Sequence, residues 1–523
     1  MIYGVPHLFR LARAGYVFAR EGVFALVDTR TLPLLPRIGI ALARLLERRN
    51  ATAQGNRLSI ALSALGPTYV KLGQFMATRP DVVGPTLARD LESLQDKMPP
   101  FPQAQAEAAV VAAFERPLST IYASFGPPVA AASIAQVHKA EVEDGGVRKP
   151  VAVKILRPGV DRRFKVDLDA FLYVAQRAEA MSLEAQRLRP VEAVNTLARS
   201  VAMEMDFRLE AAALSEMNEN ARDDVDFRVP AVDWDRTGRE VLTMEWVEGT
   251  PLNDRAALEA RGIDLPALGR KVIQSFLRHA LRDGFFHADM HPGNLFVDAQ
   301  ERLVAVDFGI MGRLGPKERR FLAEILYGFI TRDYQRTAQI HFDAGYVPRH
   351  HSVESFAQAI RAIGEPIHNR TAEDISMAKL LMLLFEVTGL FDMRTRPELL
   401  LLQKTMVVVE GVARTFDPKL DMWSTAEPVV REWIERNLGP IGRIEGAAQG
   451  AGEIGKFVSQ VPSLLTRAAT MLDQIDDITR NGLVLSPETV EAIGRAEQRR
   501  ARWTTAALWV IAVLLAWIVW TVV

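Results

Sequence analysis

Three polar side chains between residues 286 and 309 have types and spacings that suit phosphoryl transfer. Asp289 lies in a His-Ala-Asp tripeptide, Asn294 follows five residues later, and Asp307 begins an Asp-Phe-Gly tripeptide thirteen residues after the asparagine. Phosphoryl transfer needs a carboxylate to orient the acceptor and oxygen ligands for metal ions that neutralise the nucleotide phosphates. We therefore predict that Asp289 orients the attacking hydroxyl or water, and that Asn294 and Asp307 hold Mg²⁺.

Short strands and a long helix must position these side chains. The β-rich runs 295–297 and 303–306, joined by the polar turn 298–302, predict a hairpin between the asparagine and the second aspartate. The apolar pattern of residues 265–283 predicts a long supporting helix. A turn-rich hairpin with surface carboxylates is the alternative, and three elements in this order disfavour it.

A lysine and a glutamate upstream complete the pattern. Lys154 lies in the β-rich run 151–156, where a kinase carries the lysine that contacts the α- and β-phosphates. Residues 191–220 predict one long helix, in which Glu210 is our first choice for the partner of Lys154 and Glu204 the second. A solvated, charge-rich helix face is the alternative for that helix.

A small-residue loop and the strand after it precede the lysine strand. We predict that they contact the nucleotide through Ala130, Ala131, Ala132, Ser133, Ile134, Ala135, Gln136, Val137 and His138. Kinases carry glycines in such a loop, whereas this chain carries alanines. Alanine cannot adopt the glycine-only backbone conformations, so the loop should be stiffer over the phosphates.

Composition excludes several classes of function. Lys and Arg (63) nearly balance Asp and Glu (64), so no overall charge favours nucleic acid. The chain has no cysteine, which excludes disulfides, iron–sulfur clusters and thiolate metal sites. Its nine histidines show no His-Glu-x-x-His spacing.

Both ends of the chain are rich in apolar residues. Residues 1–49 predict basic amphipathic helices that lie on a membrane or cover a domain, and we see no signal peptide. Residues 503–523 form an uncharged run with tryptophans near both ends, which is long enough to span a bilayer. Arginines flank only its N-terminal side, so the positive-inside rule predicts a cytoplasmic body.

Residues 450–456 satisfy the G-x-G-x-x-G pattern and nearly match a P-loop. The P-loop interpretation fails because Phe457 replaces the metal-binding hydroxyl, and the dinucleotide interpretation fails because no convincing strand precedes the glycines. We predict an amphipathic helical region over 441–500 instead.

Taken together, these motifs resemble the UbiB family of atypical kinase-like proteins that support ubiquinone biosynthesis in bacteria. The resemblance covers residues 60–310 and includes the Lys-x-Gly-Gln motif at 71–74, the alanine-rich motif at 130–138 and the Glu-Met-Asp-Phe motif at 204–207. It implies that Lys71 and Gln74 approach Glu204 and Asp206 at the active site, as regulatory residues. It also implies ATP and Mg²⁺ as cofactors, ATP hydrolysis and no ordinary protein-kinase activity.

The resemblance further implies partners and a location. The expected partners are membrane lipids, phenolic quinone precursors and other ubiquinone-biosynthesis proteins, and a homodimer is left open. The expected location is the bacterial inner membrane.

We predict an α+β, two-lobed protein-kinase-like fold with an N-terminal helical extension and a C-terminal transmembrane helix. The expected boundaries are 1–118 for the extension, 119–247 and 248–440 for the two lobes, 441–500 for the amphipathic region and 503–523 for the span. The predicted function is an ATPase or phosphotransferase of quinone biosynthesis. A nucleotide-gated scaffold that presents lipid precursors, and a true protein or small-molecule kinase, are the alternatives.

Overall fold

The computed structural model describes residues 5–26, 34–48, 57–77, 98–181, 189–367, 389–393 and 397–439, with single positions at 87, 91, 94, 186 and 387. Residues 1–434 form one compact unit and residues 435–523 form a second. The described part of the second unit ends at residue 439.

Short helices make up the N-terminal part. They are α1 (Val5–Arg20), η2 (Val23–Leu26), α2 (Leu34–Arg44), α3 (Arg57–Leu65), α4 (Pro67–Ala77), α7 (Gln103–Phe114) and α8 (Leu118–Ile121). An N–H in the first turn of a helix has no partner within the helix, so proline, which lacks this group, fits the start of α4. Ala14 of α1, Leu62 of α3 and Val70 of α4 belong to one apolar cluster, so α1 covers the other two helices. The helices predicted within residues 1–49 are confirmed.

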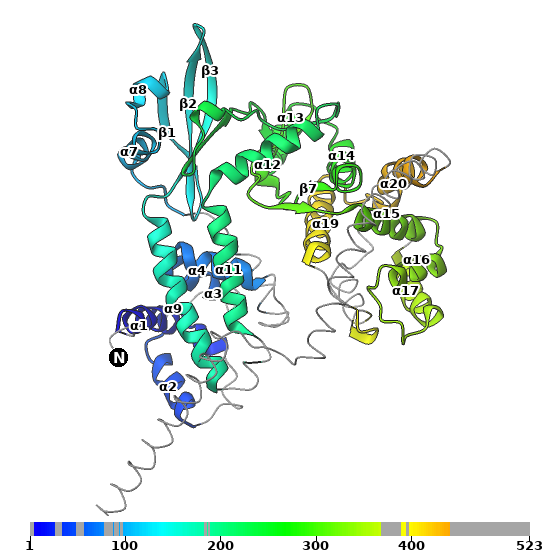
Figure 1. Ribbon diagram of the computed structural model, residues 1–523, viewed down its shortest axis with the longest axis horizontal. Helices are drawn as coiled ribbons and strands as arrows, with labels where there is room; N and C mark the ends of the chain where they lie inside the picture. Colours follow the sequence, from blue (N-terminus) through cyan, green and yellow to red (C-terminus); the bar gives the residue numbers. More distant parts are fainter. Residues whose placement is uncertain are drawn as a thin grey trace, which may run out of the picture. The chain divides into compact units, whose positions relative to one another are not determined.

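An antiparallel sheet follows, in the order β1-β2-β3-β5 (Figure 1). Its strands are β1 (Ser124–Ala131), β2 (Ala135–Asp144), β3 (Val147–Leu156) and β5 (Val241–Glu245). The β2–β3 turn consists of Gly145 and Gly146, whose φ angles of 59° and 81° favour glycine. This tight turn pairs Val137 with Lys154. One face of the sheet packs on Phe101 and α7, through residues that include Val110 and Val153.

Three helices lie between the third and the last strand of this sheet. They are α9 (Val160–Met181), α11 (Pro190–Glu204) and α12 (Phe207–Asn220). The single helix predicted over 191–220 is therefore wrong. Asp206 breaks it, since its side chain accepts a hydrogen bond from the Arg208 amide and caps α12. Glu204 consequently ends one helix, and Glu210 lies in the first turn of the next.

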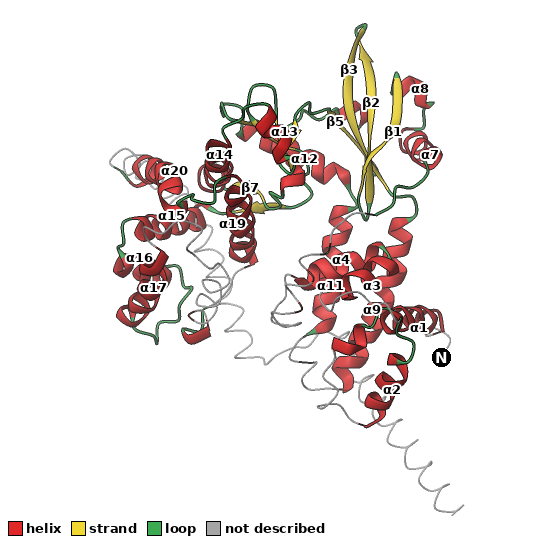
Figure 2. Cartoon of the chain, turned by 180° about the vertical axis from the view of Figure 1, so that it is seen from behind, coloured by secondary structure: helices red, strands yellow, loops and turns green. Residues whose placement is uncertain are grey.

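The rest of the unit is mainly helical, with short strands around the predicted hairpin (Figure 2). Residues 227–313 also contain β4 (Phe227–Arg228), η5 (Trp234–Arg236), β6 (Thr250–Pro251), α13 (Arg255–Ala260), α14 (Leu265–Arg278), η6 (His279–Asp283), β7 (Phe285–His287), η7 (Pro292–Asn294), β8 (Leu295–Val297), β9 (Leu303–Ala305) and β10 (Met311–Arg313). The later helices are α15 (Pro316–Ile330), α16 (Tyr334–Asp343), α17 (Val353–Ile367), α19 (Pro397–Phe416) and α20 (Met422–Leu438). The predicted hairpin is confirmed as β8 and β9, and the supporting helix as α14 and the η6 turn.

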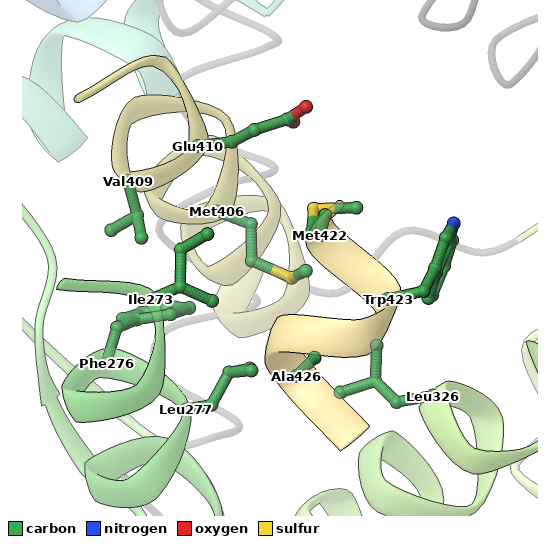
Figure 3. Close-up of a pocket in the computed structure, with 10 residues that line it drawn as sticks. All are labelled: Ile273, Phe276, Leu277, Leu326, Met406, Val409, Glu410, Met422, Trp423 and Ala426. Atoms are coloured by element: carbon green, nitrogen blue, oxygen red, sulfur yellow. The ribbon is translucent and has the colours of Figure 1, made fainter. Parts of the chain in front are cut away.

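Four of these helices meet at a small apolar cavity of about 20 Å³ (Figure 3). It is lined by Ile273, Phe276 and Leu277 of α14, Leu326 of α15, Met406, Val409 and Glu410 of α19, and Met422, Trp423 and Ala426 of α20. Glu410 is the one acidic lining residue, and it pairs with Arg414 at 2.7 Å. A space of this size holds about one water, so the cavity is a packing gap rather than a ligand site.

No helix among the described residues is long and apolar enough to cross a bilayer. The transmembrane segment predicted at 503–523 lies outside the described residues. So does the amphipathic region at 441–500, with its glycine-rich motif.

Candidate active site

Lys154 on β3, Glu210 on α12 and Asp307 after β9 form one charged group, called here the lysine cluster. Lys154 Nζ lies 2.7 Å from Glu210 Oε1 and 3.3 Å from Asp307 Oδ1. Glu210, and not Glu204, is therefore the partner of the strand lysine. The Lys154 and Glu210 side chains are 12% and 6% exposed, whereas Asp307 is 46% exposed, so the aspartate is the open side of the cluster.

The environment sets the charges of these groups. Burial would lower the pKa of Lys154, but Asp307 and Glu210 raise it, so the ammonium stays charged. Burial raises the pKa of Glu210, and this effect outweighs the lowering of that pKa by the Lys154 charge. Burial would also raise the pKa of Asp307, but Lys154 and the Gly309 amide lower it to about 2. Asp307 is thus an ionised, solvent-facing carboxylate at neutral pH.

The catalytic loop between β7 and η7 carries Asp289 and Asn294. Asn294 Nδ2 donates to both the carbonyl and Oδ2 of Asp289, each at 3.1 Å. The Asp289 amide donates to His287 Nδ1 at 3.1 Å. Burial lowers the pKa of His287, which keeps its imidazole neutral and able to accept that bond. The exposed Asp289 is therefore held from both sides.

The Asp-Phe-Gly segment packs directly against this loop. The Phe308 ring meets the His287 ring edge to face at 5.0 Å. The Ala288 amide donates to the Ile310 carbonyl, and Thr405 Oγ1 of α19 donates to the Ala288 carbonyl. These contacts join the segments that carry Asp289 and Asp307 into one unit.

The oxygen groups at this place fit Mg²⁺. Carboxylate and amide oxygens are the hard ligands that Mg²⁺ prefers, and Asp307 is ionised at neutral pH. Lys154 supplies a fixed positive charge beside them, as the α- and β-phosphates of ATP require. The residues present can therefore hold both cofactors.

The alanine-rich loop connects β1 to β2 through a tight turn. The Ala132 amide donates to the Ala135 carbonyl at 2.8 Å. Arg157, which follows β3, holds this turn with Nη2 at 3.1 Å from the Ala132 carbonyl and Nε at 3.3 Å from the Ser133 carbonyl. Its Nη2 also donates to the Pro99 carbonyl. The sequence interpretation missed Arg157, although an arginine directly after the lysine strand is a visible signal.

Two residues assigned to the nucleotide have another role. Val137 is the cross-strand partner of Lys154 and shares its face, so Gln136 and His138 point to the opposite face. Both are fully buried there, and Gln136 bonds the amide of Phe101 at 2.9 Å and the Nε2 of His138 at 2.8 Å. His138 Nδ1 donates to the Gly126 carbonyl. In this structure the two side chains have a packing role on the face opposite Lys154.

The Lys-x-Gly-Gln motif lies on α4, beside α9 and α11 (Figure 1). Lys71 Nζ pairs with Glu204 Oε2 at 2.5 Å, and both side chains are mostly buried. Gln74 is half-buried on the next turn of α4. Asp206 forms a two-fold bond with Arg208 instead, besides its cap of α12. Its role in the structure is that of a helix cap.

Glycine is required at position 73 by close packing. A Cβ there would lie 2.7 Å from the side chains of Leu62 and Leu94. The glycine of the motif thus lets α4 approach α3, which is a structural role.

Two family models match the chain. The ABC1 atypical kinase-like domain matches residues 93–341, a range that holds the whole lysine cluster and the catalytic loop. The UbiB helical domain matches residues 360–421.

Similar proteins cover most of the chain. "Probable protein kinase UbiB" of Marinobacter nauticus is 40% identical over 447 residues, which are 84% of this chain and 81% of that protein. The protein of the same name from Azotobacter vinelandii is 38% identical, over 85% and 83% of the two chains. A solved complex of Rv3197 with erythromycin, from Mycobacterium tuberculosis, is 24% identical with a TM-score of 0.49, over 76% of this chain and 98% of that one.

Proposed function

The chain belongs to the UbiB family of atypical kinase-like proteins, and from this premise we propose that it is an ATP-dependent hydrolase or phosphotransferase of ubiquinone biosynthesis. The observation that carries the proposal is the lysine cluster, in which a strand lysine meets a helix glutamate and the aspartate of Asp-Phe-Gly. This combination is the phosphate-binding arrangement of kinases.

Each polar side chain has a distinct task in the proposed reaction. When bound, ATP would supply the phosphoryl group, and Mg²⁺ would neutralise the charge of the phosphates. Lys154, fixed by Glu210, contacts the α- and β-phosphates, while Asp307 and Asn294 offer oxygen ligands to the metal. Asp289, held by Asn294 and His287, orients the attacking water or hydroxyl and accepts its proton.

Water or a small molecule suits the acceptor better than a peptide. After Gly309 the chain enters β10 at Met311, and α15 begins at Pro316. That leaves no long activation segment on which a peptide could dock. Phenolic quinone precursors are the acceptor or activator class that we propose.

A membrane location follows from the sequence of the C-terminal end. We propose that residues 503–523 anchor the protein in the bacterial inner membrane with its catalytic body in the cytoplasm. Membrane lipids and other ubiquinone-biosynthesis proteins are then the expected partners. Exposed leucines, such as Leu42 of α2 and Leu45 in the turn after it, offer a second contact with lipid.

One observation favours a nucleotide-gated scaffold as the second candidate function. Lys71 of α4 pairs with Glu204, and three residues later Phe207 lies with its ring 5.5 Å from Lys154 Nζ. A shift of the lysine cluster on nucleotide binding would therefore reach the N-terminal helices through residues 204–207. In this version turnover resets a conformational switch.

The test is nucleotide turnover by the pure full-length protein in anionic liposomes, with and without a phenolic precursor. We expect Asp307→Asn to weaken Mg²⁺-dependent ATP binding and to lower turnover, while Asp343→Asn, on the exposed end of α16, behaves like the parent. Mass spectrometry of the products distinguishes hydrolysis from transfer. If Asp307→Asn turned over ATP at the parent rate, the assigned site would be wrong.

A further inference from the structure

Two adjacent histidines and one aspartate meet at the surface, outside the lysine cluster and the catalytic loop. His350 and His351 lie between α16 and α17, and Asp392 lies in the turn after residue 390. The two Nε2 atoms lie 3.6 and 3.2 Å from the same atom, Oδ2 of Asp392. One ligand atom from each residue fits within a 4.8 Å span.

A hydrogen bond accounts for only one of the two contacts between a histidine and Asp392. The His351 contact at 3.2 Å is a hydrogen bond, but 3.6 Å from His350 is too long for one. A tetrahedral metal with bonds of roughly 2.0–2.1 Å to its ligands sets neighbouring ligand atoms roughly 3.3 Å apart. Both observed separations lie near that value, so one shared ion explains why two imidazoles face one oxygen.

The ligands are held in place by the apolar core below them. Phe391, next to Asp392, is buried, and its ring lies 5.2 Å from the His351 ring and 5.0 Å from the Phe356 ring. The His350 and His351 rings lie 4.1 Å apart. Asp392 adopts a φ of 48°, an uncommon conformation that surrounding contacts must maintain. The cluster is therefore preorganised on both sides.

The donor atoms indicate the kind of metal. Imidazole nitrogens suit zinc and related transition metals, whereas Mg²⁺ and Ca²⁺ prefer oxygen ligands. Side chains of His350 and Asp392 are 65% and 67% exposed, which leaves room for metal entry and for water as a further ligand. An ion held here by the three side chains would keep a position open for water.

We propose that His350, His351 and Asp392 bind one divalent transition-metal ion of the zinc class and thereby clip the α16–α17 connection to the 391–392 turn. The clip joins residues 41 positions apart in the sequence. Because the three ligands meet only in the folded chain, a bound ion would favour the folded state and stabilise this helical region. The site does not depend on the proposed enzymatic function, because none of its residues lies in the catalytic machinery.

The experiment is Zn²⁺ titration of the metal-free, full-length protein without a polyhistidine tag, by competition with a chromophoric chelator. Excess Mg²⁺ keeps the oxygen ligands of the catalytic site occupied. We expect one Zn²⁺ per chain, and a higher unfolding temperature when it binds. Co²⁺ should give visible absorption bands of a nitrogen- and oxygen-ligated ion.

Three variants remove one ligand each while keeping the local packing. His350→Ala removes an exposed ring, His351→Phe keeps a ring against Phe391, and Asp392→Asn retains a residue type that tolerates positive φ. Since the loss of an outer partner already costs 10–100-fold in affinity, each variant should bind Zn²⁺ at least about tenfold more weakly. The metal-free variants should unfold at the parent temperature, which separates ligand loss from misfolding.

Glu354→Gln is the matched control, since this exposed carboxylate lies three residues after His351 in the sequence and is not part of the cluster. It should bind Zn²⁺ like the parent. The proposal is overturned if the parent shows no saturable Zn²⁺ binding, or if any of the three ligand variants binds as tightly as the parent.

Discussion

The segment from β7 to Gly309 and the strand region 130–138 are equally rich in motif residues, but they use their polar side chains differently. In the first, Asn294 donates to Asp289 within one loop, and the Ala288–Ile310 backbone bond joins this loop to the segment that carries Asp307. In the second, Gln136 and His138 point away from Lys154 into the core under α7. A loop can gather side chains at one place, whereas a strand alternates them between two faces.

The two regions carry their motif residues for different reasons. In the proposed function, residues of the catalytic loop serve the chemistry, whereas those on the back of the sheet serve packing. Gln136 satisfies the buried backbone of Phe101, which links the N-terminal helices to the sheet. Substitutions in the two regions should therefore affect different measurements.

Among residues outside the catalytic loop, the largest effect should follow Lys154→Met, which removes the cation between Glu210 and Asp307. Loss of a fixed electrostatic partner of the reacting group typically costs about 10²–10³-fold in rate. We expect that loss in ATP turnover by purified protein in liposomes. Lys149→Met, an exposed lysine on the same strand, is the control and should turn over ATP normally.

Gln136→Leu should reduce stability and leave the chemistry intact. It leaves the buried Phe101 amide without its acceptor, which costs about 1–3 kcal/mol. Urea unfolding should show that loss, while turnover per folded molecule stays within about twofold of the parent. Gln105→Leu, an exposed glutamine of α7, should unfold like the parent. A large fall in turnover with unchanged stability would return Gln136 to the nucleotide site.

Arg157→Gln should disturb the alanine-rich turn and thereby weaken ATP binding. It removes the bonds to the Ala132, Ser133 and Pro99 carbonyls. Losing a charged hydrogen bond costs about 1.5 kcal/mol, so KM for ATP should rise roughly tenfold. Steady-state kinetics should show kcat nearly unchanged. If kcat fell roughly tenfold while KM for ATP stayed constant, the turn would not position the nucleotide.

The smallest effect should come from the Lys71–Glu204 pair. In a double-mutant cycle with Lys71→Ala and Glu204→Ala, we expect a coupling energy of about 1 kcal/mol. The cycle is measured by urea unfolding, and in parallel by ATP affinity. Coupling in stability alone would limit the pair to packing, whereas coupling in ATP affinity as well would support a link between α4 and the lysine cluster.

The sequence contained more information on the sheet than its motifs suggested. The two-residue turn at Gly145 and Gly146 fixes the register of β2 and β3, and counting outward from it pairs Val137 with Lys154. Alternation then assigns Gln136 and His138 to the other face. The helix break was also legible, because Asp206 is a strong helix N-cap.

Contacts between distant segments could not be read from local pattern. Arg157 reaches Pro99 across 58 positions, and His351 reaches Asp392 across 41. Such pairs depend on how whole helices pack, which periodicity does not specify. Lys71 and Glu204 were paired only through the family resemblance, since a charged residue on a helix is usually solvated.

The most direct test of the account compares ATP binding with ATP turnover in Asp289→Asn. Asparagine keeps the shape of the side chain but cannot take the proton of the attacking water or hydroxyl. The structure therefore predicts that ATP affinity matches the parent and that turnover falls by about 10²–10⁴-fold. Full turnover in this variant would contradict the account, because it would move the chemistry away from the loop between β7 and η7.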